Sequence, residues 1–474
     1  MLAAMPPTPP TSPLPGEPPV RDRGDACPGA LRLHSADDGR LARLRLPAGL
    51  LTVRQAQVLA SVAEGLGDGR ISVTSRGNVE LRGLGEGCGA ELAEVLADAG
   101  LLPSATHERI RNVVASPTAG LDGLGCGDVQ LWARELDALL CGREWTAALS
   151  GRFLFVLDDG RGDVAGLGGD VTLVAGETSV RLRVGDQVFA VAPVDAPRAA
   201  LAAAGAFLDA AHAAGNGAWR VRELPGEHVP GLAEALAAAG VPAEPVPAPT
   251  PPRTAAPPPA PGLLGEHALH VLTPLGRLTA AHLRALAESA AGGENADGTE
   301  KADSAKRVDN PANAAASHGE LRLTPWRGVV VTGFADRAAA RERLAVLDTY
   351  GLITDPRSPW AGVGACTGRP GCAKSLADVR ADATPGHGGA PEHDATPGHT
   401  DATPGHADAP GGLPVALPVH FSGCERRCGH PQAETWVDVV ATGEGTYLVD
   451  GRPTPRTDLP DAVAAARTPS ATTR

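Results

Sequence analysis

The sequence predicts an α+β protein built from a duplicated unit, and three features that recur in the same order support this prediction. They are an amphipathic helix that begins at a threonine, a strand pattern with an Arg-Gly pair, and a Gly-Leu turn at 100–101 and again at 351–352. Two close pairs of cysteines lie only in the second copy. Chance can produce one such match, whereas three in order indicate duplication.

In the first copy, Thr52 is predicted to cap a helix, because its hydroxyl oxygen can accept a hydrogen bond from a free backbone N–H group. Apolar side chains over residues 53–63 recur at helical spacing, which predicts one buried face. Residues 71–83 alternate between apolar and polar and contain Arg76-Gly77. Alternation of this kind predicts a half-buried strand.

The second copy repeats these features in the same order. Thr279 takes the capping position before a helix with apolar residues over 283–287. Residues 321–333 form the equivalent predicted strand and contain Arg327-Gly328. This match aligns Arg327 with the arginine of the first copy.

Composition excludes several classes of protein. The formal charge is -13 and no long basic run occurs, which argues against a nucleic-acid partner. No apolar run reaches the ~20 residues of a membrane span, and no signal peptide opens the chain. Eight cysteines in 474 residues do not form a disulfide framework. We therefore expect a soluble protein of the reducing cytoplasm.

The four cysteines of the second copy have the spacing of a metal cluster. Cys366 and Cys372 form a C-x5-C pair, Cys424 and Cys428 form a C-x3-C pair, and 51 residues separate the pairs. Two loops can bring four thiolates to one [4Fe–4S] cluster, and the glycines around them allow the backbone to wrap closely. A zinc site usually has tighter spacing and remains the alternative.

With these motifs, the chain resembles the nitrite/sulfite reductase superfamily over most of residues 26–460. The resemblance depends on residues 74–78, on residues 111–113 and on the two cysteine pairs. Within the superfamily, residues 26–29 ahead of 45–47, residues 157–163 and residues 372–382 are most similar to the precorrin-3B synthases of aerobic cobalamin biosynthesis.

The resemblance implies a duplicated fold with two ferredoxin-like half-domains and two α/β domains around a tetrapyrrole cleft. Low-complexity segments supply the expected tails, linker and insertions. The predicted division is a Pro-rich disordered tail (1–25), half-domain 1 (26–92), α/β domain 1 (93–243), a Pro-rich linker (244–262), half-domain 2 (263–350, with an insertion at 291–318), a cluster-binding α/β domain 2 (351–460, with a His-containing repeat insertion at 382–412) and a tail (461–474).

The function implied by the resemblance is that of a monooxygenase. Precorrin-3A would be hydroxylated by O2 at the meso carbon between rings A and D, with formation of a γ-lactone. NADH would supply the electrons through a separate reductase or a small ferredoxin, because no complete dinucleotide-binding motif occurs in the sequence.

The resemblance also places basic residues in the cleft, where guanidinium groups would bind the carboxylates of the macrocycle. The expected substrate-binding residues are Arg45, Arg76, Arg111 and Arg152. The expected catalytic residues are Arg76, Asn78 and Arg111, with Asn78 as a hydrogen-bonding partner of a carboxylate or a bound oxygen species. Cys428 matches the cysteine that bridges the cluster to sirohaem iron in the reductases.

The expected cofactors are a [4Fe–4S] cluster and, by resemblance, a mononuclear non-haem iron. No ligand set for that iron can be read from the sequence, and the candidate ligands are His34, His107, His420 and His430. Sirohaem is expected only if the protein is a reductase instead.

Two other functions remain open. One is a sirohaem-dependent assimilatory sulfite or nitrite reductase. That enzyme needs a basic cage around its small substrate, and at three of the cage positions this chain has Ser72, Leu154 and an arginine, Arg152, in place of lysine. The other is a non-catalytic tetrapyrrole carrier or sensor that holds a cluster.

The remaining cysteines are expected to be buried or inert thiols. They are Cys27, Cys88, Cys126 and Cys141. The acidic run at 158–163 is interpreted as a turn, with a place beside the cleft as the alternative.

Overall fold

A computed structural model describes residues 25, 27–247, 256–291, 319–386, 416–431, 435–443 and 445–468. The described strands form four sheets, which together with the helices confirm the predicted α+β duplicated fold. Almost all of the predicted N-terminal tail, most of each predicted insertion and residues 248–255 of the predicted linker lie outside the described residues. Residues 461–467 of the predicted C-terminal tail are helical, and the domain boundaries stay predictions. Among the helices that are described, none has the length and apolar character needed to cross a membrane.

The first ferredoxin-like half has one sheet and two helices. In sheet order the strands are β1 (His34–Ala36), β2 (Gly39–Leu44), β5 (Val79–Leu84), β4 (Arg70–Val73) and β14 (Arg277–Thr279). Helices α1 (Val53–Leu66) and α2 (Gly89–Asp98) belong to this half. The apolar face of α1 packs into the core, as its periodicity predicts.

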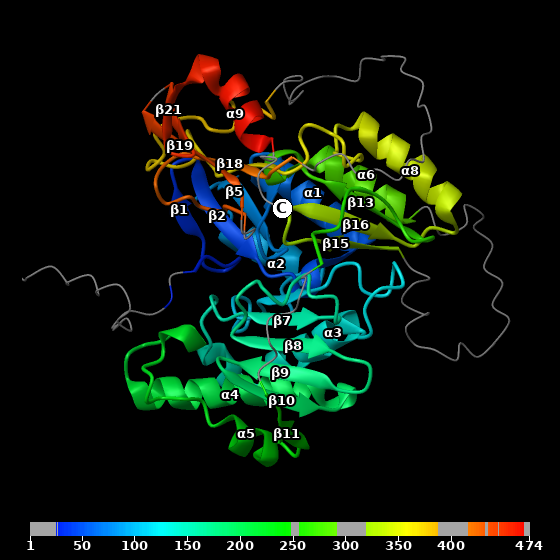
Figure 1. The fold of residues 1–474 in the computed structure, drawn as a ribbon, viewed down its shortest axis with the longest axis vertical. Helices are drawn as coiled ribbons and strands as arrows, with labels where there is room; N and C mark the ends of the chain where they lie inside the picture. Colours follow the sequence, from blue (N-terminus) through cyan, green and yellow to red (C-terminus); the bar gives the residue numbers. More distant parts are fainter. Residues whose placement is uncertain are drawn as a thin grey trace, which may run out of the picture.

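The second half repeats this arrangement. In sheet order its strands are β12 (Gly262–Leu264), β13 (Ala268–Leu272), β16 (Gly328–Thr332), β15 (Glu320–Leu323) and β3 (Leu50–Thr52), and its helices are α6 (Ala280–Ala291) and α8 (Arg337–Thr349). Helix α6 packs against α1, and a single hydrophobic core runs through both halves. Figure 1 shows these halves side by side in the upper part of the molecule.

The two halves exchange a strand with each other. Strand β14 comes from the second half of the chain and pairs with β4, where Leu278 lies opposite Ile71. Strand β3 comes from the first half and pairs with β15, where Leu51 lies opposite Leu321. Each sheet therefore draws residues from both predicted half-domains.

Both predicted helix caps are confirmed. The Thr52 side chain accepts a hydrogen bond from the Gln55 N–H group, and the Gln55 side chain accepts one from the N–H group of Thr52. The Thr279 hydroxyl accepts from the N–H group of His282, whose ring accepts from the Thr279 N–H group in return. Each helix thus begins with two satisfied donors.

The segments 71–83 and 321–333 are hairpins rather than single strands, which corrects the prediction. In the first turn, the N–H group of Gly77 donates to the Thr74 carbonyl at 3.1 Å. In the second turn, the N–H group of Arg327 donates to the Thr324 carbonyl at 3.0 Å. The φ angles of Gly77 and Arg327 are 67° and 61°. Arg327 is therefore the counterpart of Gly77, and the alignment of the two Arg-Gly pairs is wrong by one residue.

Two α/β units complete the fold, and both begin with three parallel strands followed by antiparallel ones. The first contains β6 (Val113–Ala115), β7 (Phe155–Asp158), β8 (Val171–Ala175), β9 (Val180–Val184), β10 (Gln187–Val191) and β11 (Ala243–Pro245), with α3 (Val129–Cys141), α4 (Ala196–Ala214) and α5 (Leu232–Ala238). The second contains β17 (Val363–Ala365), β18 (Val419–Ser422), β19 (Val437–Gly443), β20 (Thr446–Val449), β21 (Arg452–Pro455) and α9 (Leu459–Arg467). In Figure 1 the first unit forms the lower lobe.

Short 3-10 helices connect several of these elements. They are Pro47–Gly49, Glu144–Ala148, Pro193–Asp195, Val221–Glu223, Pro274–Gly276 and Arg456–Asp458. The first and fifth occupy equivalent places, because each leads into one of the exchanged strands.

The turn before β3 leaves no room for a side chain at Gly49. Its φ angle is +69°, and a Cβ atom there would lie 2.0 Å from the carbonyl oxygen of Leu323. We expect Gly49→Ala to lower the free energy of unfolding by about 3 kcal/mol in a urea titration. The control is Gly65→Ala inside α1, where a Cβ meets nothing within 4 Å and should raise stability by ~0.5–1 kcal/mol. Equal effects of the two changes would contradict this expectation.

Candidate functional site

A cavity of about 570 Å³ opens between the ferredoxin-like halves and both α/β units. Its wall is strongly basic. Eight arginines line it: Arg43, Arg45, Arg76, Arg152, Arg220, Arg222, Arg327 and Arg380. Two glutamates, Glu80 and Glu223, also line it, so positive charge is in clear excess.

Three of the four predicted substrate-binding arginines lie in this wall. Arg45 follows β2 and is buried, with its guanidinium group donating to the carbonyl groups of Arg109 and Gly151. Arg76 lies in the turn between β4 and β5. Arg152 precedes β7 and is exposed, and its guanidinium carbon lies 4.9 Å from the ring centroid of Trp219.

Several cavity arginines have no carboxylate to balance their charge. Arg43 pairs with Glu80, and Arg220 pairs with Asp170. In the described part of the chain, no ion pair joins a carboxylate to Arg45, Arg76 or Arg380. Burial is the main cause that lowers the pKa of Arg45 to about 9, of Arg76 to about 10 and of Arg380 to about 9. These groups remain charged at neutral pH, and an anionic ligand would stabilise them.

Arg111 and Asn78 do not line the cavity. The guanidinium group of Arg111 donates two hydrogen bonds to Asp137, at 2.6 and 2.7 Å. The Asn78 side chain accepts from the Leu46 N–H group and donates to the side chain of Asn112. Their placement gives both residues structural partners and does not support the catalytic roles expected from the resemblance.

Both cysteine pairs lie at the carboxyl ends of adjacent parallel strands. Cys366 directly follows β17, and Cys424 lies two residues after β18. The Cys366 N–H group donates to the carbonyl of Phe421, and the Gly423 N–H group points at the Cys366 sulfur at 3.2 Å. Parallel neighbours end at the same edge of a sheet, so the two loops meet there.

The loop of the first pair is held by the first ferredoxin-like half, which the sequence analysis did not detect. The guanidinium group of Arg82 pairs with Asp38 at 2.8 and 2.9 Å and also donates to the carbonyl of Gly371 at 2.6 Å. Asp37 accepts a hydrogen bond from the N–H group of Ala373, directly after Cys372. These contacts join residues more than 280 positions apart, and no local pattern signals them.

The four thiols are close enough to influence one another. Burial is the main cause that raises the pKa of Cys428, and the charges of Cys366, Cys424 and Cys372 raise it further. Four thiolates that repel one another would be stabilised by the positive core of a metal cluster. Cys366 and Cys428 also line the cavity. The donor set therefore fits a cluster that lies beside the cavity.

The histidines do not supply a second iron site at the cavity. The His107 ring contacts Ser104 and the carbonyl of Arg143, and the buried His420 ring contacts the carbonyl of Cys428. No histidine is among the described residues that line the cavity. The described residues of the cavity wall therefore do not supply the histidine ligands expected for a mononuclear iron.

Cys27, one of the cysteines expected to be buried or inert, is a residue of the cavity wall. It lines the cavity, next to Pro28 and Gly151. Burial is the main cause that raises the pKa of its thiol, and the nearby Asp25 raises it further. The thiol is therefore neutral at pH 7, and its place in the wall makes it part of the binding surface.

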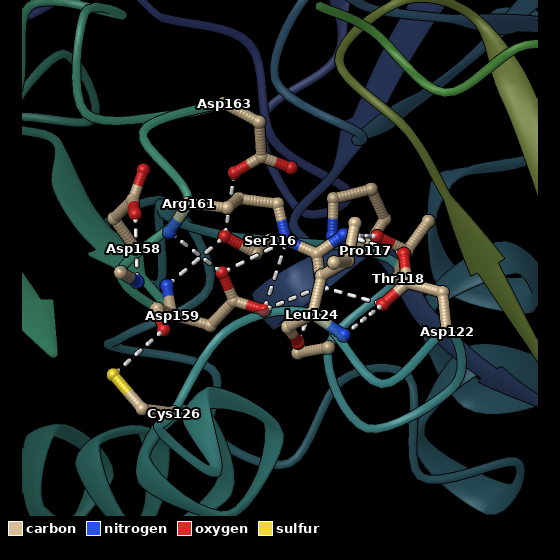
Figure 2. Close-up of polar contacts among 12 residues, drawn as sticks. Ser116, Pro117, Thr118, Asp122, Leu124, Cys126, Asp158, Asp159, Arg161 and Asp163 are labelled. Atoms are coloured by element: carbon tan, nitrogen blue, oxygen red, sulfur yellow. Dashed lines mark hydrogen bonds and ion pairs between the residues drawn. The ribbon is translucent and has the colours of Figure 1, made fainter. Parts of the chain in front are cut away.

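The first α/β unit carries an ionic network where the second carries cysteines (Figure 2). Ser116 follows β6 as Cys366 follows β17, and its hydroxyl donates to Asp163 at 2.6 Å. Asp158 accepts four backbone hydrogen bonds, and Arg161 pairs with both Asp159 and Asp122. Oxygens of Asp158, Asp159 and Asp163 lie within 4.8 Å of one another, but the first two are already satisfied. The acidic run is a bonded turn outside the cavity wall.

Comparisons with known proteins show which fold this molecule has. Residues 34–99 match the model of the nitrite/sulfite reductase ferredoxin-like half domain. The structure is similar to that of NirA from Mycobacterium tuberculosis, with a TM-score of 0.65 and 18% sequence identity, over 92% of this chain and 82% of that chain. The chain has the duplicated nitrite/sulfite reductase fold.

Within this class, the chain is similar to precorrin-3B synthase from Sinorhizobium sp., with 28% identity over 438 residues, which is 90% of this chain and 83% of that protein. It is also similar to ferredoxin–nitrite reductase from Synechococcus elongatus, with 33% identity over 127 residues, which is 26% of this chain and 25% of that protein. The resemblance predicted from the motifs is confirmed.

Proposed function

We propose that the protein is a precorrin-3B synthase that oxidises precorrin-3A within the arginine-lined cavity. The observation that carries the proposal is that Arg45, Arg76 and Arg380 line the cavity together with Cys366 and Cys428, while no carboxylate among the described residues forms an ion pair with any of the three arginines. A tetrapyrrole with many carboxylates supplies the missing negative charge, and guanidinium groups bind carboxylates bidentately. The match to precorrin-3B synthase along most of the chain supports the same assignment.

The proposed reaction inserts one atom of O2 into the substrate as a hydroxyl group at the meso carbon between rings A and D. The other atom leaves as water, which takes two electrons and two protons, and a ring acetate closes as a γ-lactone. A [4Fe–4S] cluster held by Cys366, Cys372, Cys424 and Cys428 would pass the electrons one at a time, from NADH through a separate reductase or ferredoxin.

The residues of the chain bind and orient the substrate. Arg45 and Arg76 approach the cavity from the first ferredoxin-like half, and Arg380 follows the loop of the first cysteine pair. Contacts from both sides would fix the macrocycle in one orientation, which presents one meso carbon for reaction. At the mouth, Arg152 stacked on Trp219 offers charge and an aromatic face to a peripheral carboxylate or ring.

A sirohaem-dependent sulfite or nitrite reductase is the second candidate, because sirohaem is also a polycarboxylate and a nitrite reductase matches part of the chain. The residues at the cage positions favour the first candidate. Ser72 lines the cavity without charge, and Leu154 is buried in an apolar cluster with Val156. A small anion would therefore find less positive charge than the reductases offer.

The test is an anaerobic absorption spectrum with analysis of extracted cofactors, followed by addition of precorrin-3A, an electron donor and air. A cluster band without sirohaem and conversion to the hydroxylactone are expected. Tightly bound sirohaem with no change in precorrin-3A would make the protein a reductase. Binding of precorrin-3A without consumption of oxygen would make it a carrier or sensor.

A further inference from the structure

The turn between β15 and β16 has an arginine where its counterpart in the first half has a glycine. Arg327 has a φ angle of 61°, a region that costs a non-glycine residue ~1–2 kcal/mol, and the counterpart at this position is Gly77. Both turns have the same hydrogen bonds to threonine. The hairpin therefore does not need an arginine, and a strained residue of this kind suggests a function.

Three glycines make room for the Arg327 side chain. A Cβ atom at Gly276 would lie 2.5 Å from its Cδ, one at Gly364 would lie 2.7 Å from Nη1, and one at Gly429 would lie 2.6 Å from Nη2. Gly364 is in the middle of β17, where the first α/β unit has Val114 in the middle of β6. The second α/β unit therefore has a glycine where the first has a buried valine, and the missing side chain leaves room for this arginine.

The guanidinium group of Arg327 holds the turn that follows the last cysteine. Its Nη2 donates to the carbonyl of Gly429 at 2.5 Å. The ring of His420 contacts the neighbouring carbonyl of Cys428 at 3.0 Å, and His420 stands where β7 has Val156. The side chains of Arg327 and His420, which have no counterpart in the first half, thus hold the carbonyl groups of Gly429 and Cys428.

Arg327 also belongs to the cavity wall, and its charge has no dedicated partner. It lines the cavity with Cys366 and Cys428. Among the described residues no carboxylate forms an ion pair with it, and the anionic groups that act on it are Cys366 and Glu80, which is already paired with Arg43. Its positive charge can therefore interact both with the cysteine thiolates and with an anionic ligand bound in the cavity.

We propose that Arg327 couples the cavity to the cluster, so that a bound anionic tetrapyrrole and an electron on the cluster each weaken the other's binding. This inference rests on the proposed function. One electron enters the cluster, supplied by dithionite in the test, and Arg327 stays protonated, so no proton moves. A polyanion next to Arg327 makes that reduction less favourable, and reduction must weaken tetrapyrrole binding by the same factor.

The first test uses the wild-type protein under argon, where O2 cannot start the reaction. The affinity for precorrin-3A is measured with the cluster oxidised and again after reduction by dithionite. We expect about tenfold weaker binding to the reduced protein, which corresponds to a fall of about 59 mV in the one-electron midpoint potential on binding. Equal affinity in both states would overturn the inference. Absence of a cluster or of precorrin-3A binding would instead overturn the proposed function.

The second test asks whether the coupling depends on Arg327. The midpoint potential of the cluster is determined in variants by a redox titration that is monitored through the electron paramagnetic resonance signal of the cluster. Arg327→Gln removes the charge, and Arg327→Gly restores the residue of the equivalent turn and relieves the positive φ angle. Without ligand, each substitution should make reduction of the cluster about tenfold less favourable. Each should also make the change in midpoint potential on precorrin-3A binding smaller than in the wild-type protein. Arg76→Ala is the matched control, because Arg76 lines the same cavity without a contact to the cysteine loops among the described residues. Equal potentials in the Arg327 and Arg76 variants would contradict the assignment.

Discussion

Replacing Cys428 by serine is expected to remove the cluster and abolish oxidation of precorrin-3A. The charges of the other three cysteines act on the Cys428 thiol, and serine is a far weaker ligand for iron. The iron content should fall from about four atoms per chain to nearly none. Turnover should fall at least ~100-fold, because loss of a direct ligand exceeds the effect of an outer-shell change. Metal analysis, absorption spectroscopy and product formation check these expectations.

The control for this change is Cys88→Ser. The Cys88 thiol donates to the carbonyl of Gly85 at 3.2 Å, a contact that a serine hydroxyl can replace, and it lies outside the cysteine loops. Iron content and turnover should match those of the unmodified protein. A purified wild-type protein with one zinc ion and no iron would show that the four cysteines form a zinc site instead.

Arg76→Ala is expected to weaken precorrin-3A binding and leave the cluster in place. The lost interaction is a charge-assisted hydrogen bond in a partly buried site, worth about 1.5–3 kcal/mol. The dissociation constant should therefore rise roughly 10- to 150-fold. It is measured by titration under argon, with iron content determined on the same samples. Loss of iron with unchanged affinity would show that Arg76 acts on the cluster loops.

Arg111→Ala is the comparison that separates binding from folding. Arg111 was expected in the cleft, but it pairs with Asp137 and is not among the described residues that line the cavity. Its loss should lower the free energy of unfolding and leave the affinity for precorrin-3A within about twofold, because the partner left unpaired is a carboxylate of α3. A large loss of affinity without loss of stability would return Arg111 to the binding site.

The sequence was sufficient where the signal is local or chemical. The spacing of the cysteines, the threonine caps and the motif that carries Arg76 all correspond to features of the structure. Long-range partners could not be predicted in this way. Asp137 lies 26 positions from Arg111, and nothing in either segment announces the pair that keeps Arg111 out of the cavity.

The alignment of the two turns is another feature that could not be predicted correctly from the sequence. Arg-Gly occurs in both turns, yet the hydrogen bonds make Arg327 equivalent to Gly77 rather than to Arg76. This one-residue offset between the two Arg-Gly pairs cannot be detected from the amino-acid sequence, because it depends on which backbone N–H group closes each turn. Cys27 was missed for a related reason, since only the folded chain shows that its segment passes along the cavity wall.

The exchange of β3 and β14 makes this molecule the covalent form of a dimer. A first half made alone would lack β14, leaving β4 as an open sheet edge, while its own β3 would have no sheet to join. Open edges seek other strands, and the complementary half is the partner that fits both. One symmetrical ancestor pairing with its own copy would have built two equal sites. In the single chain the two sites are free to differ: one carries four cysteines and Arg327, and the other carries a network of serine, aspartates and arginine.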